Sequence, residues 1–457
     1  MRRIFTLTLC LPFVLAGCLH RSQIKREDMK VKQAFAQKAT ARQKMGPWWK
    51  LFGDPTLDRL MTLAFRDNLD LAAAQARLDQ ARYRLRGATA GWLPKAQAKV
   101  DVARSQSIFN LPDPLGPKTI TGTNLSFSLA ASYEIDLWGR VYHQRKSAKY
   151  ALQASVEELR AGHITLAAGL ADAYYATVQQ RAQIKLLDKT IESREAQVKL
   201  VRQRYKSGVA RADELYHALQ SLAGAKAQRE QALGLLQTTQ NALAVLVGRF
   251  PGHIDAGSLD ALPPAVKEFG AGIPGELLEQ RPDLRAALLR LKAADQQVGA
   301  AFAAHFPQIR IGGSLGYQLE PASGFVWNLF AGLVAPLFEQ VSINAQYNES
   351  KAKLRESVAL FKKTLLNAVR EVEDALATGR ATAKRIKWLQ ERVLAAEGAL
   401  RLSTDQYTQG LTIYLNVLTA EQALLQARTE LIAARRELIA ARVSLARALG
   451  GAWMDAD

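Results

Sequence analysis

The sequence has almost no cysteine, and it has no long apolar segment after its start. Its only two cysteines, Cys10 and Cys18, lie near the N-terminus, so the remaining chain has no pair for a disulfide and must be stabilised by burial. No stretch beyond them offers about eighteen uncharged apolar residues, the length that a transmembrane helix needs. Any crossing of a bilayer would therefore be made by β-strands that close into a barrel.

Motifs of the common enzyme classes are also missing. The six histidines have no metal-ligand spacing, and there is no H-E-x-x-H helix, phosphate-binding glycine loop or G-x-S-x-G turn. Two groups of carboxylates remain, Asp213 with Glu214, and Glu371 with Glu373 and Asp374. On charge-rich helices such groups are typical of salt-bridged faces. We expect no enzyme activity, no metal site and no cofactor.

The N-terminus follows the pattern of a secretory signal. Arg2 and Arg3 precede an apolar run of thirteen residues, 4–16, which is too short to span a bilayer as a helix. The run ends in Leu-Ala-Gly-Cys at 15–18, which resembles a bacterial lipobox and predicts removal of 1–17 and attachment of lipid, including palmitate, to Cys18. A chance cysteine after an ordinary signal is the alternative. By resemblance to sorted lipoproteins, leucine rather than aspartate at position 19 favours the outer membrane.

The chain is strongly basic. Its formal charge is +19, which falls by two to +17 when Arg2 and Arg3 leave with the signal. A solvated basic helix surface accounts for this charge. Nucleic-acid binding is the other usual explanation, but an exported lipoprotein meets little nucleic acid, so we do not expect it.

The chain contains an internal duplication. Leu71 and Pro94 recur as Leu284 and Pro307, both 213 residues later. Further on, six positions recur 202 residues later as the same or a similar residue. These pairs are Ile184/Ile386, Leu187/Leu389, Ile191/Val393, Val198/Leu400, Tyr205/Tyr407 and Gly208/Gly410. The chain is therefore expected to fold as two structural repeats.

Each repeat predicts a helix that ends near a proline, two strand-like stretches, a very long helix and a return helix. The expected helices of the two repeats are 56–91 and 275–304, 139–206 and 340–408, and 210–248 and 411–449. Each long helix would reach about 100 Å at about 1.5 Å per residue. Apolar residues at coiled-coil spacing from Ile184 to Tyr205, interrupted by Arg194, predict packing against an antiparallel neighbour.

The strand-like stretches alternate apolar and polar residues. The alternation is clear over 96–102 and 124–129, and less clean over 325–333. Such segments fit transmembrane strands of about ten residues, although a small soluble sheet would give the same pattern. Single-chain barrels begin at about eight strands, so a membrane barrel built from four strands per chain requires several copies of the chain.

Three segments resemble the TolC-like outer-membrane factors of tripartite efflux systems, in particular their lipoprotein branch. They are 47–55 (PWWKLFGDP), 133–140 (YEIDLWGR) and 371–376 (EVEDAL), and the resemblance covers nearly all of the mature chain. One departure follows Leu337-Phe338, where the family usually has glycines and a basic residue and this chain has Glu339-Gln340-Val341. The departure concerns local geometry and not the fold.

The resemblance implies a mainly α-helical fold with a transmembrane β-barrel contribution. Long antiparallel coiled-coil helices form a tunnel across the periplasm, and four strands per chain complete a twelve-stranded barrel in a homotrimer. A mixed region at the waist of the tunnel uses residues near 19–55, 250–274 and the C-terminus. The tips of the helices meet a periplasmic membrane-fusion adaptor, which links to an inner-membrane pump of the RND or a related type. The implied function is efflux of small molecules from the periplasm to the outside, as in antibiotic resistance.

These interpretations predict an outer-membrane protein that is lipid-anchored and extends into the periplasm. The expected organisation is a signal peptide 1–17, a lipid-anchored segment 18–55, a first repeat 56–250, a linker 251–274 in the waist region, a second repeat 275–450 and a tail 451–457.

Two groups of residues are candidate functional sites. The turns at which the long helices reverse are the expected adaptor contacts: Ser207, Gly208, Val209, Gln409, Gly410 and Leu411. The resemblance implies a narrow periplasmic gate close by, with these candidates: Tyr205, Arg211, Asp213, Glu214, Tyr407, Asn416 and Thr419. Asn416 and Thr419 stand where the family commonly has aspartates, which predicts an entrance that is less cation-selective than usual and suits neutral or anionic cargo such as aromatic acids. Asp213, Glu214 and Asp405 could restore a negative ring, and this alternative stays open.

Two other functions remain open at this point. A purely structural periplasmic coiled-coil lipoprotein would explain the long helices but not the strand pairs. The outer component of a protein-secretion system would share the whole architecture. Drug, metal and aromatic-acid cargo are not distinguished, although the sequence has no methionine- or histidine-rich tract that would favour metal.

Overall fold

The computed structural model describes residues 34–36, 47–110, 117–252, 254–263, 268–320 and 323–450. The expected signal peptide, Cys18 and the tail 451–457 lie outside the described residues. The Cα positions group into two units. One contains Arg77–Ser155 and Ala286–Lys362, and the other contains Val156–Arg285 with the described residues of 30–76 and 363–457. Each unit therefore takes segments from both halves of the sequence.

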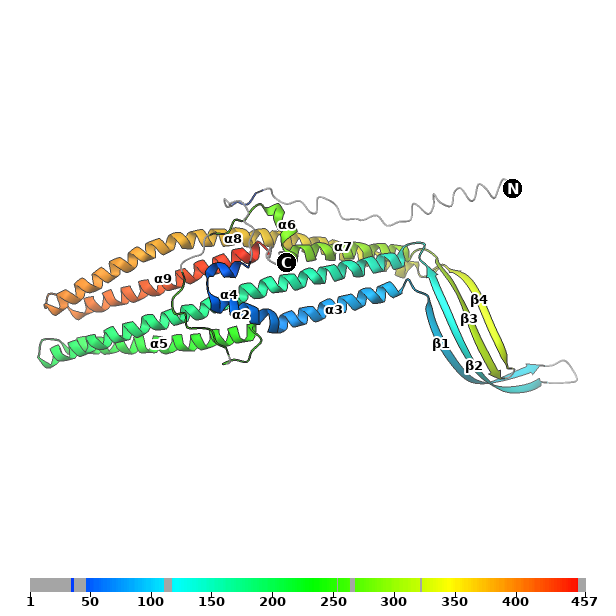
Figure 1. The fold of residues 1–457 in the computed structure, drawn as a ribbon, viewed down its shortest axis with the longest axis horizontal. Coiled ribbons are helices and arrows are strands. Elements are labelled where there is room, and N and C mark those ends of the chain that lie inside the picture. Colours follow the sequence, from blue (N-terminus) through cyan, green and yellow to red (C-terminus); the bar gives the residue numbers. More distant parts are fainter. Residues whose placement is uncertain are drawn as a thin grey trace. The chain divides into compact units, whose positions relative to one another are not determined.

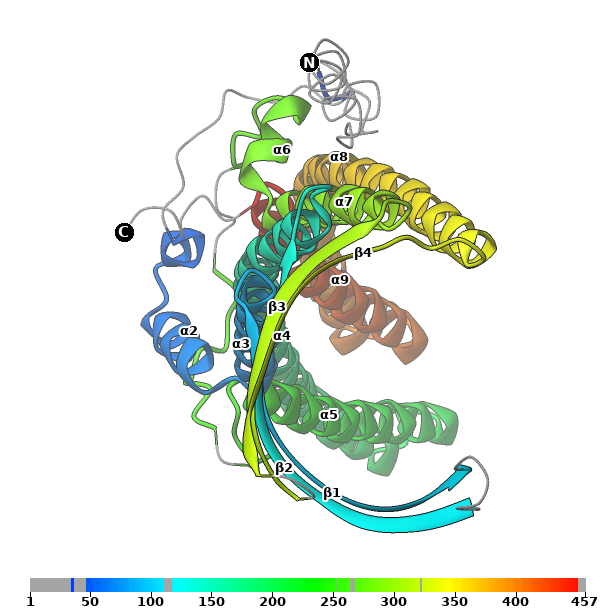
Figure 2. The ribbon, with the colours of Figure 1, turned by 90° about the vertical axis from the view of Figure 1, so that its right-hand side faces the viewer.

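The first unit contains an antiparallel four-stranded sheet in the order β1-β2-β3-β4. Its strands are β1 (Lys95–Asn110), β2 (Pro117–Ile135), β3 (Gln308–Glu320) and β4 (Gly324–Val334). Figure 2 shows the strands curving together as one sheet. The sheet joins the two repeats, because β2 of the first repeat pairs with β3 of the second along Leu125 to Ile135. β1 and β4 each have a partner on one side only within the described chain.

The strand register separates the side chains into two faces. Val100, Phe127, Tyr317 and Phe325 form one row across all four strands, so their side chains lie on the same face. The rings of Tyr317 and Phe325 are 5.1 Å apart, as this pairing requires. The next row on this face contains Ala98, Leu129, Leu315 and Trp327. The alternation expected from the sequence is therefore confirmed, and it leaves one apolar and exposed face.

The opposite face of the sheet is largely polar. Lys99, Ser128, Gly316 and the apolar Val326 form one of its rows, and Gln97, Ala130, Ser314 and Asn328 form another. Most of the large side chains on the apolar face remain exposed to solvent in the single chain. A sheet with such a face needs another surface to cover it, because burial of apolar area contributes about 25 cal/mol per Å².

Two long helices and two return helices follow the strand pairs. The long helices are α4 (Arg140–Lys206) and α8 (Gln340–Thr408), and the return helices are α5 (Ala212–Leu246) and α9 (Tyr414–Ala448). Figure 1 shows each return helix beside the long helix that precedes it. Exposed ion pairs join the partners, such as Arg229 of α5 with Asp188 of α4 and Arg392 of α8 with Glu430 of α9. The predicted antiparallel helix pairs are confirmed. None of the helices in the described part of the chain has both the length and the apolar character of a membrane span.

The helix predicted at the start of each repeat is interrupted. Instead of 56–91 the structure has α2 (Pro55–Asp67) and α3 (Leu69–Ala90), and instead of 275–304 it has α6 (Leu277–Gln280) and α7 (Pro282–Ala303). Asn68 is extended, and its side-chain oxygen accepts a hydrogen bond from the Leu71 amide at 2.9 Å, which caps α3. Arg281 is extended because the ring of Pro282 disfavours a helical residue before it. The prediction of one continuous helix was wrong at both places.

The main core of the second unit gathers segments from distant parts of the sequence. Trp48 and Trp49, in the 3₁₀ helix η2 (Trp48–Phe52), are buried beside residues of α4, α8 and α9 and beside Ala256 and Phe269 of the connecting segment. Burial raises the pKa of Glu268, but hydrogen bonds from Arg380 and Arg442 outweigh it and hold the pKa below its usual value. The described residues near Trp48 and in the segment 254–274 therefore share one packed core with α4, α8 and α9.

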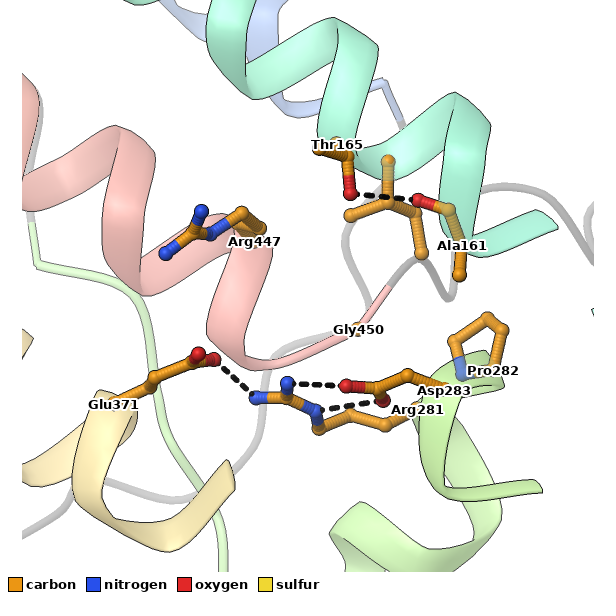
Figure 3. Close-up of a pocket in the computed structure, with 9 residues that line it drawn as sticks. Ala161, Thr165, Arg281, Pro282, Asp283, Glu371, Arg447 and Gly450 are labelled. Atoms are coloured by element: carbon orange, nitrogen blue, oxygen red, sulfur yellow. Dashed lines mark hydrogen bonds and ion pairs between the residues drawn. The ribbon is translucent and has the colours of Figure 1, made fainter. Parts of the chain in front are cut away.

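Arg281 connects the second repeat to this core. Its guanidinium bonds Asp283 at 2.6 Å and Glu371 at 2.9 Å (Figure 3). It also donates to the Ala448 carbonyl oxygen at 2.9 Å. Arg370 pairs with Asp374 at 3.0 Å. The carboxylates Glu371 and Asp374 are thus members of ion pairs, as the sequence suggested.

The tips of the two helix pairs

The two reversals of the long helices have the same backbone hydrogen bonds. At the first tip the Val209 amide donates to Arg204 O at 2.9 Å and the Gly208 amide to Tyr205 O at 3.0 Å. At the second tip the Leu411 amide donates to Gln406 O at 2.8 Å and the Gly410 amide to Tyr407 O at 3.1 Å. This six-to-one and five-to-two pattern is the Schellman motif. Each long helix therefore ends in the same cap, 202 residues apart.

The glycine of each cap has a left-handed backbone. Gly208 has φ +73° and Gly410 has φ +77°, where a side chain would be strained by about 1–2 kcal/mol. A Cβ at either position would meet no atom within 4 Å. The requirement for glycine comes from the backbone angle and not from crowding.

Below the caps, one tyrosine of the second pair contacts the first pair. The Tyr407 hydroxyl donates to Glu214 Oε2 at 2.8 Å, and the Arg204 guanidinium lies 4.8 Å above its ring. The Tyr414 ring packs against it at 5.5 Å between centroids. Burial and the bond to Glu214 raise the pKa of Tyr407 above its usual value, so the phenol stays protonated and continues to donate. These contacts connect α4, α5, α8 and α9.

A buried ion pair lies further from the tips. Arg194 Nε is 3.2 Å from Glu421 Oε2, and Arg194 Nη1 donates to the Ser221 carbonyl oxygen at 2.6 Å. Both side chains are buried, and together they join α4, α5 and α9. Burial raises the pKa of Glu421 more than Arg194 lowers it. The bond to Ser221 therefore helps to hold Arg194 beside Glu421, while burial opposes ionisation of the Glu421 carboxyl group.

The structure brings together only some of the gate residues expected from the sequence. Glu214 and Tyr407 are bonded to each other, and Arg211 forms an exposed ion pair with Asp213 at 3.2 Å. Tyr205 was expected at a packed position of the coiled coil, but its residue is 45% exposed, whereas the equivalent Tyr407 is 4% exposed. That expectation was wrong. The position that holds Tyr414 at the second tip holds Ala212 at the first, and among the described residues no aromatic ring packs against Tyr205.

Asn416 and Thr419 lie on the exposed side of α9. Asn416 Nδ2 donates to Thr412 Oγ1 at 2.6 Å, and Thr419 Oγ1 donates to Leu415 O at 2.9 Å. Asn416 thus bonds the turn before α9, Thr419 bonds within α9, and both residues are exposed. The six adaptor-contact candidates at the caps, from Ser207 to Val209 and from Gln409 to Leu411, are exposed as well.

The sequence analysis missed the partners of Arg194. It marked Arg194 as an interruption of the apolar pattern, but Glu421 lies 227 residues away and nothing local indicates the pair. Arg194 also lines a groove of about 830 Å³ between α4, α5 and α9. The groove contains eight glutamines: Gln179, Gln180, Gln183, Gln220, Gln228, Gln231, Gln422 and Gln426. Their spacing on three helices was visible in the sequence, but not their convergence.

Comparisons with known proteins agree with this architecture. The family model described as outer membrane efflux protein matches residues 60–249 and 273–451. The pyoverdine export outer membrane protein OpmQ of Pseudomonas putida is 31% identical over 416 residues, which cover 89% of this chain and 88% of the relative. The toluene efflux pump outer membrane protein TtgC of Pseudomonas putida is 31% identical over 419 residues, with 89% and 85% covered. The solved structure of the outer-membrane channel OprN aligns with a TM-score of 0.85 at 26% identity, over 95% of this chain and 99% of that one.

Proposed function

Because the chain belongs to the outer membrane efflux protein family, we propose that three copies of it form a tunnel that exports small molecules and is gated at the helix tips. The outer-membrane efflux channel predicted from the sequence is confirmed at the level of the family and of the fold. The observation that carries the proposed gate is the bridge from Tyr407 to Glu214, which connects two helix pairs that end in identical caps.

The trimer follows from the sheet. β1 and β4 have unpaired outer edges within the described chain, and unpaired backbone groups in lipid are unfavourable by several kcal/mol each. In our proposal β4 of one copy pairs with β1 of the next, and three copies complete the twelve-stranded barrel expected from the sequence. The test is export from a strain that lacks the chromosomal gene, followed as ethidium accumulation, with and without the restored chain. Equal accumulation in both strains would contradict the export function.

The proposal includes a periplasmic adaptor and an inner-membrane pump as partners. Efflux channels of this family work as trimers with an adaptor and an inner-membrane pump. We assign the adaptor contact to the two caps, because they are exposed turns with the same backbone hydrogen bonds. An inner-membrane pump of the RND or a related type completes the assembly in this proposal. The chain itself is assigned no catalysis, since its paired carboxylates are engaged in ion pairs or hydrogen bonds.

The entrance is proposed to favour neutral or anionic cargo, including aromatic acids. Asn416 and Thr419 are exposed and uncharged where the family commonly has aspartates, and no carboxylate ring is formed by them. Reversal potentials of the purified channel in planar bilayers across a salt gradient measure this property. The native channel should be weakly selective, and Asn416→Asp with Thr419→Asp should shift it toward cations. Strong cation selectivity in the native channel that the two substitutions leave unchanged would contradict the proposal.

The lipid anchor is proposed at Cys18, which lies outside the described residues. Its support is the Leu-Ala-Gly-Cys sequence that ends the apolar run. Growth with labelled palmitate should label the native protein and not Cys18→Ser. Equal labelling of the variant would show that lipid is attached elsewhere.

A further inference from the structure

The two tips share one backbone but present different surfaces. Equivalent positions lie 202 residues apart, so each residue of the first tip can be compared with its counterpart at the second. Lys206 corresponds to Thr408, Arg202 to Thr404, and Lys199 to Arg401. The residue that precedes the return helix is Arg211 at the first tip and Ile413 at the second.

At the first tip the cations form a stripe. Lys199, Arg202 and Lys206 follow one another at spacings of three and four residues, so they lie on one face of α4, and all three are exposed. Among the described residues none of the three has a carboxylate within ion-pair distance. Two acidic residues close to the stripe in the sequence are paired with other cations: Glu195 with Lys226 at 2.8 Å, and Asp213 with Arg211 at 3.2 Å.

At the second tip, exposed apolar side chains follow the cap. Leu411, Ile413 and Leu415 are all exposed, next to the uncharged Asn416. The corresponding positions of the first tip hold Val209, Arg211, Asp213 and Glu214.

Capping of the helix does not explain the cations. Positive side chains stabilise a helix C-terminus by about 0.3–1 kcal/mol, and Lys206 lies in the last turn of α4. However, α8 ends in the same Schellman cap with no basic residue in its last turn. The fold of the tip therefore does not require the stripe, and three unpaired cations on one face are available to a partner.

We propose that the first tip docks an acidic segment of the periplasmic adaptor through Lys199, Arg202 and Lys206, while the second tip contacts an apolar segment of the same adaptor. The inference rests on the proposed adaptor contact and adds its chemistry. Carboxylates of the adaptor lie against the stripe, and its aliphatic side chains lie against Leu411 and Ile413. The arrangement fixes which of two nearly equivalent tips receives which part of the partner.

A carbodiimide is the direct probe, because it joins an amine to a carboxylate only where the two are in contact. Treatment of isolated cell envelopes should link Lys199 or Lys206 to an Asp or Glu of a periplasmic protein, identified by mass spectrometry. Lys199→Arg with Lys206→Arg removes both amines and keeps the charge, so the link should disappear. In a parallel sample, a photoreactive amino acid at position 411 should capture the same protein.

The carbodiimide link and the photocapture together distinguish the acidic contact from the adaptor contact itself. Capture at position 411 without any carbodiimide link would overturn the acidic contact and leave the adaptor contact standing. No capture in either arm, from a channel that exports normally, would overturn both. A link from the stripe to a protein other than the one captured at position 411 would also overturn the inference.

Charge removal gives a second readout. Lys199→Gln, Arg202→Gln and Lys206→Gln together should weaken binding of the purified adaptor captured in the first experiment by about three- to tenfold at physiological salt, with a shallower salt dependence. The matched control removes three exposed cations of the second pair, Lys384→Gln, Lys387→Gln and Arg401→Gln, and should leave the affinity unchanged. Equal losses in both triple variants would mean that only net charge matters, and this would overturn the inference.

Discussion

At the first tip α4 turns into α5 through Gly208, and at the second α8 turns into α9 through Gly410, with the same hydrogen bonds and the same left-handed glycine. The side chains around these turns differ. Tyr407 is buried and bonded to Glu214, whereas its equivalent Tyr205 is exposed. The duplication has therefore kept the backbone of the turn and changed its contacts. The bond from Tyr407 to Glu214 joins the two tips, and it has no counterpart because the position equivalent to Glu214 at the second tip is Asn416.

Loss of the buried ion pair between Arg194 and Glu421 should have the largest effect on stability, and the second helix pair has no equivalent of it. The position equivalent to Arg194 is Ala396, and the position equivalent to Glu421 is Leu219, so the second repeat has no such pair. Arg194→Met leaves an unpaired buried carboxylate and should destabilise the protein by about 3–5 kcal/mol at neutral pH. The measurement is thermal unfolding of the detergent-solubilised protein followed by helical circular dichroism.

Acidification should reverse that loss in part. The folded pKa of Glu421 is already raised by burial, and removal of Arg194 raises it further. A carboxyl group with a raised folded pKa contributes most below its unfolded pKa, and its contribution is lost as pH rises through the folded value. The difference in unfolding free energy between the native protein and Arg194→Met should therefore become smaller from pH 7 toward about pH 4.5. The matched double variant, Arg194→Met with Glu421→Leu, should recover most of the stability at neutral pH; a double variant as unstable as Arg194→Met would show that packing, and not charge, caused the loss.

Substitution of the cap glycines should have a smaller effect that is equal at the two tips. Gly208→Val and Gly410→Val should each destabilise their turn by about 1–2 kcal/mol, because each places a branched side chain at positive φ. The double variant should lose export while trimers still form, as seen by cross-linking in membranes. Gly398→Val, in a helix where nothing lies within 4 Å of the added Cβ, is the control. If cells that carry the double variant export as well as cells with the native protein, the caps do not contact the adaptor.

The smallest predicted effect is the loss of the Tyr407 hydroxyl, and it is expected at the second tip only. Tyr407→Phe removes the hydroxyl that donates to Glu214 and should destabilise the bridge by about 1 kcal/mol. We expect a higher frequency of open events in planar bilayers. Tyr205→Phe is the matched control at the equivalent position, and it should behave as the native channel does. Equal behaviour of the two variants would mean that the bridge does not hold the entrance closed.

The sequence predicted what depends on local pattern. Prolines at 94 and 307 marked the helix-to-strand boundaries, the period of two predicted which residues share a face of the sheet, and repeat spacing aligned the two glycine caps. It did not predict contacts between residues far apart in the chain. Tyr205 and Tyr407 end the same apolar pattern, but Tyr407 is buried and bonds Glu214, 193 residues away, whereas Tyr205 is exposed. The helix breaks at Asn68 and Arg281 were missed because a single residue in extended conformation interrupts an otherwise helical pattern.

The two open edges of the sheet have a genetic consequence. β1 and β4 are its outer strands. In the proposed ring of three copies each edge joins a different neighbour, so one damaged edge interrupts the whole ring. A proline in the middle of β4 would therefore act as a dominant allele. If normal and damaged copies are produced equally and mix at random, only about one ring in eight contains no damaged copy. A bacterial cell that carries both the normal and the damaged gene would then lose most of its export capacity, although half of its protein is normal.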